Sequence, residues 1–344
     1  MSIEKEIVQY NITSMLKRLI NPKNNHESYE YLNCLERWVL SISSAGVYSI
    51  VDEKNQATKK LTEELKEKNI YGLTDQILSI VRNGLKNKPQ IFRNDTKPYN
   101  NTSKDEQGWI VDIKINNSRD IYIRIPMSKQ KYNIFLSHTK DNLTVLFLRY
   151  STLINRGQQW ALPQDQFDHL SKKYGVNYEG FASPLNSGLY SIGGSYCSLF
   201  KDTDEIFGSL GNFFNQKLYT NLEGDNEIYG RKNNEIKKWI VNPPFIISVL
   251  GQTSDKILND LSIASDLCVD MMVVYIMPSW TDFDGYTKIQ NSKYLKHIQN
   301  LERKKHFYEH MGKRKVVNSR STMFVLDTYA DEKDYSDIAS PMML

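Results

Sequence analysis

The sequence predicts an α/β fold, in which helices alternate with the strands of a largely parallel sheet. The clearest sign is a short apolar run, Trp239–Val241, at the end of a predicted strand over 236–241, which is followed by Asn242-Pro243-Pro244-Phe245. Proline donates no backbone hydrogen bond and restricts the residue before it, so a buried strand must stop there. Apolar residues then recur at helical spacing over 245–264, and 269–277 suits another buried strand. The motif therefore lies on a strand-to-helix turn at the carboxyl edge of the sheet, where open α/β sheets bind ligands.

Further strands are predicted on both sides of this turn. Two short apolar segments, 178–186 and 196–204, each end in polar turn residues, and a helix is predicted over 164–174. Only about a dozen residues separate the two strands, close to the minimum for a parallel crossover, so any element that connects them must be very short. With a last strand over 322–326, these elements complete a core over 156–327.

Residues 1–92 predict a helical domain. Apolar residues share one face of each of two predicted helices, and the charged stretch between them, 53–69, predicts an outer helix. The apolar residues are Leu32, Leu35, Val39, Ile42, Leu73, Ile77, Ile80 and Val81. No catalytic pattern occurs in this part of the chain, so we expect it to serve packing or substrate docking.

The character of the chain changes after this domain. Residues 93–108 are polar, with Pro, Gly and Asn, and predict a linker or a long exposed loop. Apolar and polar residues then alternate on either side of a polar turn within 109–126, which indicates a β-hairpin. The apolar stretch 142–153 fits either a helix or a strand. Residues 215–235 predict an insertion loop, and the polar tail 328–344 predicts a loosely held terminus.

The composition is that of an ordinary globular protein. Of 344 residues, 40% are hydrophobic and 24% are charged. Three distant cysteines, Cys34, Cys197 and Cys268, support neither a disulfide framework nor a zinc site. The start of the sequence carries acids and no apolar signal region, and no apolar run approaches the length of a membrane span. We expect an intracellular protein without metal or membrane partners, cytoplasmic or, if it acts during transcription, nuclear.

The positive charge is concentrated in one segment. Between Tyr286 and Arg320 there are ten Lys and Arg residues against two acids, an excess larger than the net charge of +4 of the whole chain. Such a segment is typical of a phosphate-backbone partner, and the alternative is a solvated helix face. The candidate RNA-binding residues are Arg156, Trp160, Arg303, Lys304, Lys305, Lys313, Arg314 and Lys315. Trp160 suits a stacking platform for a base or, alternatively, a core position.

The six histidines do not cluster with Cys or acids at the spacing of metal ligands. His297, His306 and His310 fall in the basic segment, which we interpret as a helix. On that interpretation their side chains face solvent or phosphate.

Asn242-Pro243-Pro244-Phe245 suggests methyl transfer to a conjugated amino group. The exocyclic amine of adenine is a poor nucleophile because its lone pair is delocalised into the ring. If the Asn242 side-chain carbonyl and the Pro243 main-chain carbonyl hold both amino hydrogens, the nitrogen can pyramidalise and present its lone pair. Phe245 can stack on the base and fix its orientation. The alternative is a purely structural Asn-Pro-Pro turn.

The candidate cofactor site lies upstream. A nucleoside cofactor in a doubly wound sheet needs a close backbone turn after one strand and an acid about 20 residues further on. The turn residues here are Phe181, Ala182, Ser183, Pro184 and Asn186, and the acids are Asp202 and Asp204. The usual glycine-rich turn is missing, so a dinucleotide fits poorly and S-adenosylmethionine fits better. The alternative is that both acids sit in an ordinary surface turn.

These stretches together resemble the phosphorylated-CTD-interacting-factor family of cap-specific adenosine methyltransferases. The similar residues lie over roughly 105–327, in matching order, and comprise Arg156–Pro163, Phe181–Asn186, Tyr196–Ser198 with Phe200, Asp202–Asp204, Phe207–Ser209, Asn242–Phe245, Ile276–Trp280 and Ser321–Thr322. The resemblance implies a Rossmann-like class I S-adenosylmethionine-dependent methyltransferase core, within a methyltransferase region over 109–327, and an N-terminal helical domain. It implies methyl transfer from S-adenosylmethionine to N6 of the first transcribed, 2′-O-methylated adenosine of capped mRNA. It also implies that Asn242–Phe245 are catalytic and that the 181–186 and 202–204 turns contact the cofactor.

The chain departs from the family in two features. It shows no WW domain at the N-terminus, and its 215–235 loop is longer than we expect for the family. The abundance of Asn, Lys, Ile and Tyr is typical of AT-rich genomes, such as those of large DNA viruses and protists. Two other functions stay open. The first keeps the fold but methylates another substrate: adenine N6 of internal RNA or of DNA, where a duplex would require base flipping, or a glutamine amide. The second is a catalytically silent RNA-binding subunit.

Overall fold

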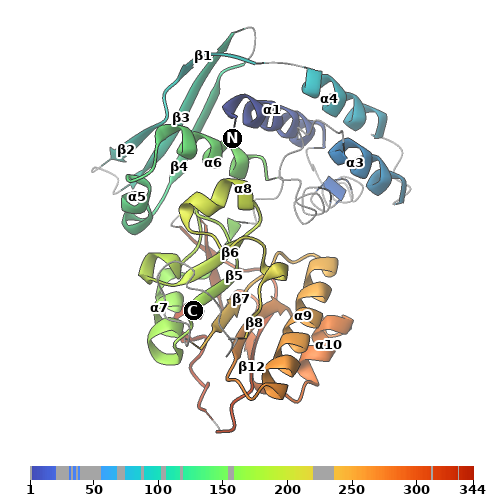
Figure 1. Ribbon diagram of the computed structural model, residues 1–344, viewed down its shortest axis with the longest axis vertical. Helices are drawn as coiled ribbons and strands as arrows, with labels where there is room; N and C mark the ends of the chain where they lie inside the picture. Colours follow the sequence, from blue (N-terminus) through green and yellow to red (C-terminus); the bar gives the residue numbers. More distant parts are fainter. Residues whose placement is uncertain are drawn as a thin grey trace. The chain divides into compact units, whose positions relative to one another are not determined.

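The computed structural model describes residues 2–20, 31, 34–35, 38, 56–67, 74–86, 89–101, 106–116, 119–153, 159–219, 236–310, 313–331 and 333–344 (Figure 1). The chain divides into two compact units. Unit 1 comprises Met1–Gln158 and Leu199–Ile206, and unit 2 comprises Gln159–Ser198 and Phe207–Leu344. Most of the predicted helix around Leu32–Ile42, Arg156 and most of the predicted 215–235 loop lie outside the described residues.

Unit 2 is built on a six-stranded sheet with the strand order β6-β5-β7-β8-β12-β9. Neighbouring strands from β6 to β8 run parallel, whereas β12 runs antiparallel to both β8 and β9. The strands are β5 (Tyr178–Ala182), β6 (Ser195–Ser198), β7 (Lys238–Val241), β8 (Met272–Pro278), β9 (Leu295–Leu301) and β12 (Ser321–Asp327). The predicted mixture of helices with a largely parallel sheet is confirmed. The short connection between β5 and β6 is confirmed too and contains only the 3-10 turn η3 (Tyr190–Ile192).

Helices cover both faces of this sheet. Figure 1 shows α7 (Gln164–Tyr174) on one side, with α9 (Ile247–Asp266) and α10 (Asp284–Gln290) on the other. Alternate residues of β8 therefore enter two separate apolar clusters. Val274 lies in the cluster beneath α7, whereas Tyr275 lies in the cluster beneath α9 and α10. Every residue of β8 is buried, which makes it the centre of the unit.

The helices of unit 2 follow from their sequences. Leu250, Ile257 and Leu261 are spaced by whole turns, and all three are fully buried along α9, as predicted. Helix α7 occupies the predicted range and ends where Gly175 takes the left-handed conformation, with φ of 72°. Glycine has no Cβ and adopts this conformation without the steric cost of other residues.

Unit 1 combines helices with a separate antiparallel sheet. Its helices are α1 (Ile3–Leu19), α3 (Gln56–Glu67), α4 (Thr74–Lys86), α5 (Lys129–Phe135), α6 (Lys140–Ser151) and α8 (Lys201–Asp204). Helix α1 packs against both α4 and α6. The charged outer helix predicted over 53–69 is present as α3, and the ambiguous stretch 142–153 belongs to helix α6.

The sheet of unit 1 is centred on β3 (Glu106–Asn116), which pairs antiparallel with β1 (Gln90–Asn94), β2 (Lys97–Asn101) and β4 (Ile121–Pro126). The predicted hairpin is confirmed as β3 and β4, in which Val111 lies opposite Ile123. The polar segment 93–108, however, contains strands rather than a continuous linker or loop. Residues of β2 are polar because they are largely exposed, and their backbone is held by pairing with β3.

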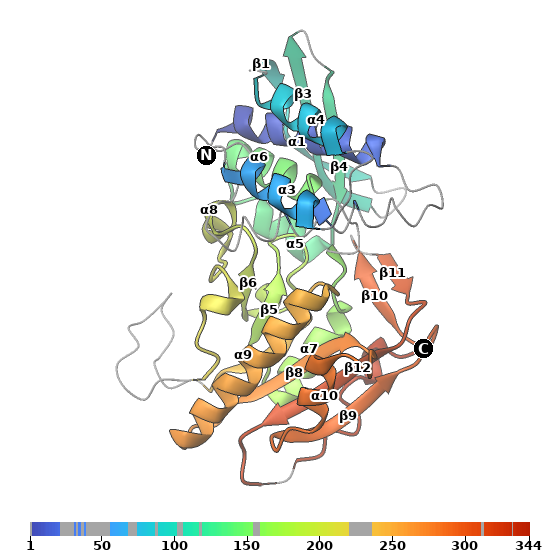
Figure 2. The same cartoon turned by 90° about the vertical axis from the view of Figure 1, so that its right-hand side faces the viewer.

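The basic segment 286–320 is not one helix, as we had interpreted it. After α10 it forms β9, and then β10 (Phe307–His310) pairs antiparallel with β11 (Lys313–Val316), as Figure 2 shows. Pairing with β12 holds β9 in the extended conformation. Such long-range pairing overrides the local preference of a charged run for a helix.

The C-terminal tail, predicted to be loosely held, packs against α7. Tyr335, Ile338 and Met342 are almost fully buried in the same apolar cluster as Phe167. The side-chain amide of Gln166, itself fully buried, donates a hydrogen bond of 2.6 Å to the Ile338 carbonyl. The prediction was wrong because three apolar side chains in a polar stretch are enough to dock the segment when a complementary surface exists.

We expect Asp337→Asn to change the pH dependence of stability. Lys173 and Tyr174 on α7 lower the pKa of Asp337 to about 2 from 3.8, because both donate hydrogen bonds to its carboxylate. A lowered pKa in the folded state stabilises the protein above the unfolded value of 3.8. This contribution is lost as the pH falls toward about 2. Chemical denaturation should show a higher free energy of unfolding for the wild-type protein than for Asp337→Asn at neutral pH. This difference should become smaller below pH 3.8. Parallel profiles would contradict the docking of the tail through Asp337.

Candidate active site at the carboxyl edge of the six-stranded sheet

The connections of the sheet change direction between β5 and β7. From β5 the chain moves outward to β6, and it then crosses back to β7 on the other side of β5. The connections therefore leave these two neighbours in opposite directions, and open α/β sheets bind ligands at the carboxyl edge of such a switch point. The segment Phe181–Asn186 follows the end of β5, and Asn242–Phe245 follows the end of β7. The structure thus brings two sequence-predicted groups together at one edge.

The Asn242–Phe245 turn contains hydrogen-bond acceptors that no described residue satisfies. The Oδ1 atom of Asn242 is buried and accepts no hydrogen bond from any described residue. Pro243 is buried, and among the described residues no donor contacts its carbonyl, whereas the Pro244 carbonyl accepts from the Ile246 N–H at 2.7 Å. The ring of Phe245 is 38% exposed, which is unusual for a large apolar side chain beside a core. Two acceptors and an accessible ring therefore lie within one tetrapeptide.

The turn after β5 is held by its own side chains. The Oδ1 atom of Asn186 accepts from the Ser183 N–H at 2.7 Å, and the fully buried Ser183 hydroxyl lies 2.9 Å from the same atom and from Gln159 Oε1. The Asn186 side-chain N–H groups contact no acceptor among the described residues, so they are available to a ligand. The Asn186 and Ser183 side chains thus hold this turn through local hydrogen bonds.

Glu179 on β5 fixes the rest of this loop. Its carboxylate is buried and accepts from the Ser187 hydroxyl at 2.9 Å, the Gly188 N–H at 3.1 Å and the Leu189 N–H at 3.4 Å. Three donors satisfy a charge that burial alone would make costly. Gly180 beside it allows close packing, because a Cβ at that position would lie 2.9 Å from the Phe213 ring.

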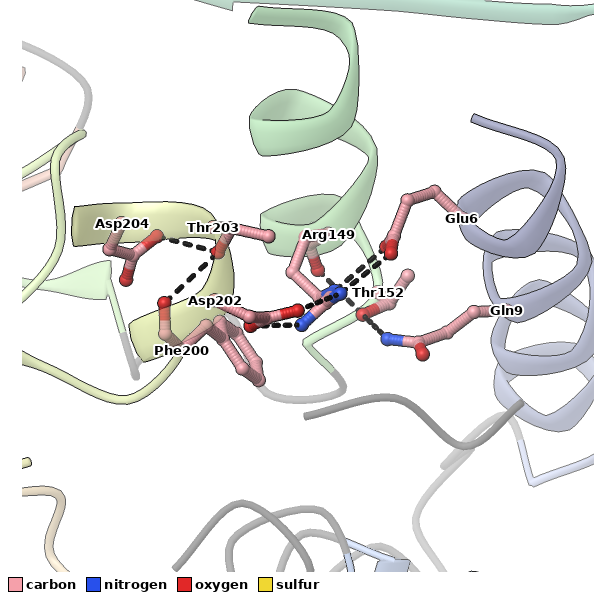
Figure 3. Close-up of polar contacts among 8 residues, drawn as sticks. All are labelled: Glu6, Gln9, Arg149, Thr152, Phe200, Asp202, Thr203 and Asp204. Carbon is pink, nitrogen blue, oxygen red and sulfur yellow. Dashed lines mark hydrogen bonds and ion pairs between the residues drawn. The ribbon is translucent and has the colours of Figure 1, made fainter. Parts of the chain in front are cut away.

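Asp202 and Asp204 lie in unit 1, where both carboxylates have partners (Figure 3). The Arg149 guanidinium lies between Asp202, at 3.1 Å and 3.2 Å, and Glu6 of α1, at 2.6 Å and 2.7 Å. Asp204 is fully buried and accepts from the Tyr150 hydroxyl at 2.5 Å and from the Thr203 hydroxyl at 2.8 Å. These acids form a structured turn within unit 1, and their predicted role at the cofactor stays a prediction.

The candidate basic residues lie in unit 2, beyond the end of β9. Strand β9 runs parallel to β8, so its carboxyl end is at the same edge as Asn242. Arg303, Lys304 and Lys305 follow that end directly, and all three are exposed. Arg314 on β11 instead pairs with Asp165 at 2.9 Å, and its guanidinium lies 4.2 Å from the centre of the Phe307 ring.

One other prediction for this region changed. Trp160 is partly buried against the apolar cluster, 6.4 Å from the Tyr308 ring, and its role as a stacking platform stays a prediction. His306 does not face solvent, because it is fully buried and its Nδ1–H donates to the Glu302 carbonyl at 2.9 Å. Burial lowers the pKa of His306, since it disfavours the charged imidazolium.

Three contributions to these sites were missed from the sequence. Glu179 is a single acid inside a buried strand, and Arg149 is a single base inside the apolar run of α6. Isolated charges within apolar runs need a buried partner, which was the available signal. Trp280, just beyond β8, is 39% exposed at the same edge as Phe245. It was noted only as part of a resembling stretch.

Among the described residues, no group of three His, Cys, Asp or Glu side chains is placed to hold a metal ion. Within the same residues, no helix is both long enough and apolar enough to cross a bilayer.

The chain is similar in sequence to a known family and to two curated proteins. The family model described as "Phosphorylated CTD interacting factor 1 WW domain" matches residues 121–311. A mouse (Mus musculus) protein named mRNA (2'-O-methyladenosine-N(6)-)-methyltransferase is 30% identical over 183 residues, which cover 49% of this chain and 22% of that protein. The human (Homo sapiens) protein of the same name is 26% identical over 180 residues, with the same coverage. The match thus spans about a fifth of the length of these relatives.

We expect Arg149→Ala to destabilise unit 1 by about 3–5 kcal/mol, because it leaves the carboxylate of Glu6 buried without a partner. Arg93→Ala is the matched control. It also removes an Arg–Asp pair, with Asp95, but one whose arginine is 63% exposed, and should change stability by less than about 1 kcal/mol. Urea denaturation measures both variants. Equal effects would show that the buried pair contributes no more than the exposed one.

Proposed function

The chain belongs to the family described as phosphorylated CTD interacting factor 1 WW domain, and from this premise we propose that it is an S-adenosylmethionine-dependent RNA methyltransferase. The proposed substrate is capped mRNA, and the proposed acceptor is N6 of its first transcribed adenosine, which is 2′-O-methylated. Both curated relatives are named mRNA (2'-O-methyladenosine-N(6)-)-methyltransferase, which gives mRNA as substrate and N6 of a 2'-O-methyladenosine as acceptor. The parallel strands β6 to β8, with helices on both faces, support a Rossmann-like core for it.

The observation that carries this proposal is the buried, unpartnered Oδ1 atom of Asn242. A buried acceptor without a donor is unfavourable. Several buried polar atoms of the described residues lack a partner, and Asn242 Oδ1 is the one of them that lies in the turn after β7. An amino group of a bound base satisfies it. With the Pro243 carbonyl as the second acceptor, both hydrogens of adenine N6 are held, and its lone pair turns out of the ring plane. Proline restricts this backbone, so the acceptors need little reorganisation in the transition state.

The other residues of the edge have supporting roles. Phe245 offers a ring on which adenine stacks, so that N6 meets the acceptors at a fixed angle. The Asn186 side-chain N–H groups suit a carboxylate, such as that of a methionine moiety. S-adenosylmethionine supplies an electrophilic methyl group. The proton that N6 loses after transfer can pass to solvent, since the Phe245 side of the turn is accessible.

We expect the purified protein to methylate capped RNA that begins with adenosine much faster than uncapped RNA or duplex DNA. A cap-adjacent adenosine is already accessible, whereas a duplex base must be unstacked and flipped at a cost of a few kcal/mol. Transfer of a radiolabelled methyl group to each substrate measures the preference. Equal rates on capped and uncapped RNA would contradict the cap-adjacent assignment, and transfer to duplex DNA alone would contradict an RNA substrate.

We expect Asn242→Ala to lower the transfer rate by about 100-fold or more, as the loss of a preorganised hydrogen-bonding group does. Because Asn242 Oδ1 has no partner in the protein, the substitution should not lower Tm. Cofactor binding measured by calorimetry should persist. Asn259→Ala on α9 is the control, because the one hydrogen bond that the exposed Asn259 side chain makes with a described residue is to the neighbouring Asp260 carboxylate. A fall in Tm without loss of turnover would identify Asn242 as structural.

A further inference from the structure

Lys304 is held in a backbone conformation that lysine normally avoids. Its φ is 58°, one of two non-glycine positive values among the described residues. Left-handed backbone is unfavourable for residues with a Cβ, because the Cβ approaches the following carbonyl oxygen. Such conformations persist only where the surroundings impose them, and they concentrate at functional sites. Glycine is the usual residue at such a position.

The surroundings do impose this conformation. The Lys304 N–H donates to the Val317 carbonyl at 2.8 Å, and the Lys305 N–H donates to the Glu302 carbonyl at 3.0 Å. The Lys305 carbonyl accepts from the Leu344 N–H at 2.8 Å, and the guanidinium of Arg303 donates to the Asn318 side chain at 2.8 Å. We call residues 302–305 the Lys304 turn. It is rigid, and it points its lysine side chains into solvent.

The charge of this turn is not neutralised within the protein. Arg303, Lys304 and Lys305 form no ion pair with any described carboxylate, and neither do Lys313 and Lys315 on β11. In contrast, Arg320 pairs with Glu302 at 3.0 Å, and Arg314 pairs with Asp165. Five exposed cations therefore lack a counter-charge in one part of unit 2. Such a surface complements a polyanion.

The position of the turn relates it to the proposed site. Three strand spacings separate β7 from β9, roughly 14 Å across the sheet at about 4.8 Å each. Stacked nucleotides advance roughly 3.4 Å along one strand, so about four of them span this distance. The turn lies too far from Asn242 to contact the methylated nucleotide itself.

We propose that the Lys304 turn, together with Lys313 and Lys315, binds the phosphates of the transcribed nucleotides that follow the methylated adenosine. This inference rests on the proposed function and adds to it a binding surface for the nucleotides beyond the methylated adenosine. Lysine rather than glycine occupies the strained position because its charge contacts phosphate. The strained backbone of the turn thus lowers the stability of the fold, whereas the charge of Lys304 strengthens substrate binding.

The test compares Lys304→Gly with the wild-type protein. Relief of the left-handed strain should raise Tm by about 2 °C. Loss of the charge should weaken binding of a capped single-stranded RNA of about eight nucleotides several-fold, and should make the salt dependence shallower by about 0.7 in slope. Lys172→Ala is the control, because Lys172 is an exposed lysine near the end of α7, where the chain enters the amino end of β5. Lys172→Ala should change neither the affinity for the RNA nor its salt dependence.

A length series gives the second readout. Fluorescence anisotropy with capped RNAs of about two, four, six and eight nucleotides should show wild-type affinity rising and then levelling near five. In the Lys304→Gly variant, affinity should increase less with RNA length than in the wild-type protein. Equal wild-type affinity for all lengths would overturn the proposal and assign the turn to the cap phosphates or to no ligand. This experiment measures RNA binding and not methyl transfer. An absence of methyl transfer would therefore contradict the proposed function, whereas the length dependence tests the binding of RNA by the Lys304 turn.

Discussion

The parallel pairing of β5 with β7 is the contact on which the edge of unit 2 depends. Tyr178 lies opposite Trp239, with ring centres 4.8 Å apart, and the Trp239 indole donates to the Leu218 carbonyl at 2.9 Å. Because these strands are neighbours in space but not in sequence, two turns nearly 60 residues apart meet. Every proposed contact with cofactor or base in unit 2 follows from this pairing. The buried strand β8 then fixes how far β9 and its basic turn lie from it.

Much of the fold could be predicted from local patterns. Prolines stop β7, a glycine ends α7, and regular apolar spacing defines α9, so these elements were found. Strands β2 and β9 could not be found this way, because polar residues in them are held extended by distant partners. The tail was missed for a related reason. Its few apolar residues carry no periodicity, and only the surface of α7 shows what they contact.

The part of the site that could be predicted is the part whose functional groups lie close together in the sequence. Asn242–Phe245 carries its acceptors and ring within four residues, and the parallel sheet places the 181–186 turn beside it. The partners of Asp202 and Asp204 could not be predicted, because Arg149 and Glu6 are remote in sequence. The same holds for the basic residues. The sequence shows ten cations in the segment but not which of them, such as Arg314 and Arg320, are neutralised.

The passage of Leu199–Ile206 through unit 1 has a consequence for how the protein can be divided. Neither unit is a continuous piece of chain, so no single cut separates them. A fragment that begins at Gln159 carries α8 without α6, which leaves the fully buried Asp204 and Phe200 without the side chains that cover them. A fragment that ends at Gln158 retains Arg149 and Glu6 but lacks the Asp202 carboxylate. A chimaera that exchanges one unit with that of a relative must therefore keep α8 together with the helices of unit 1.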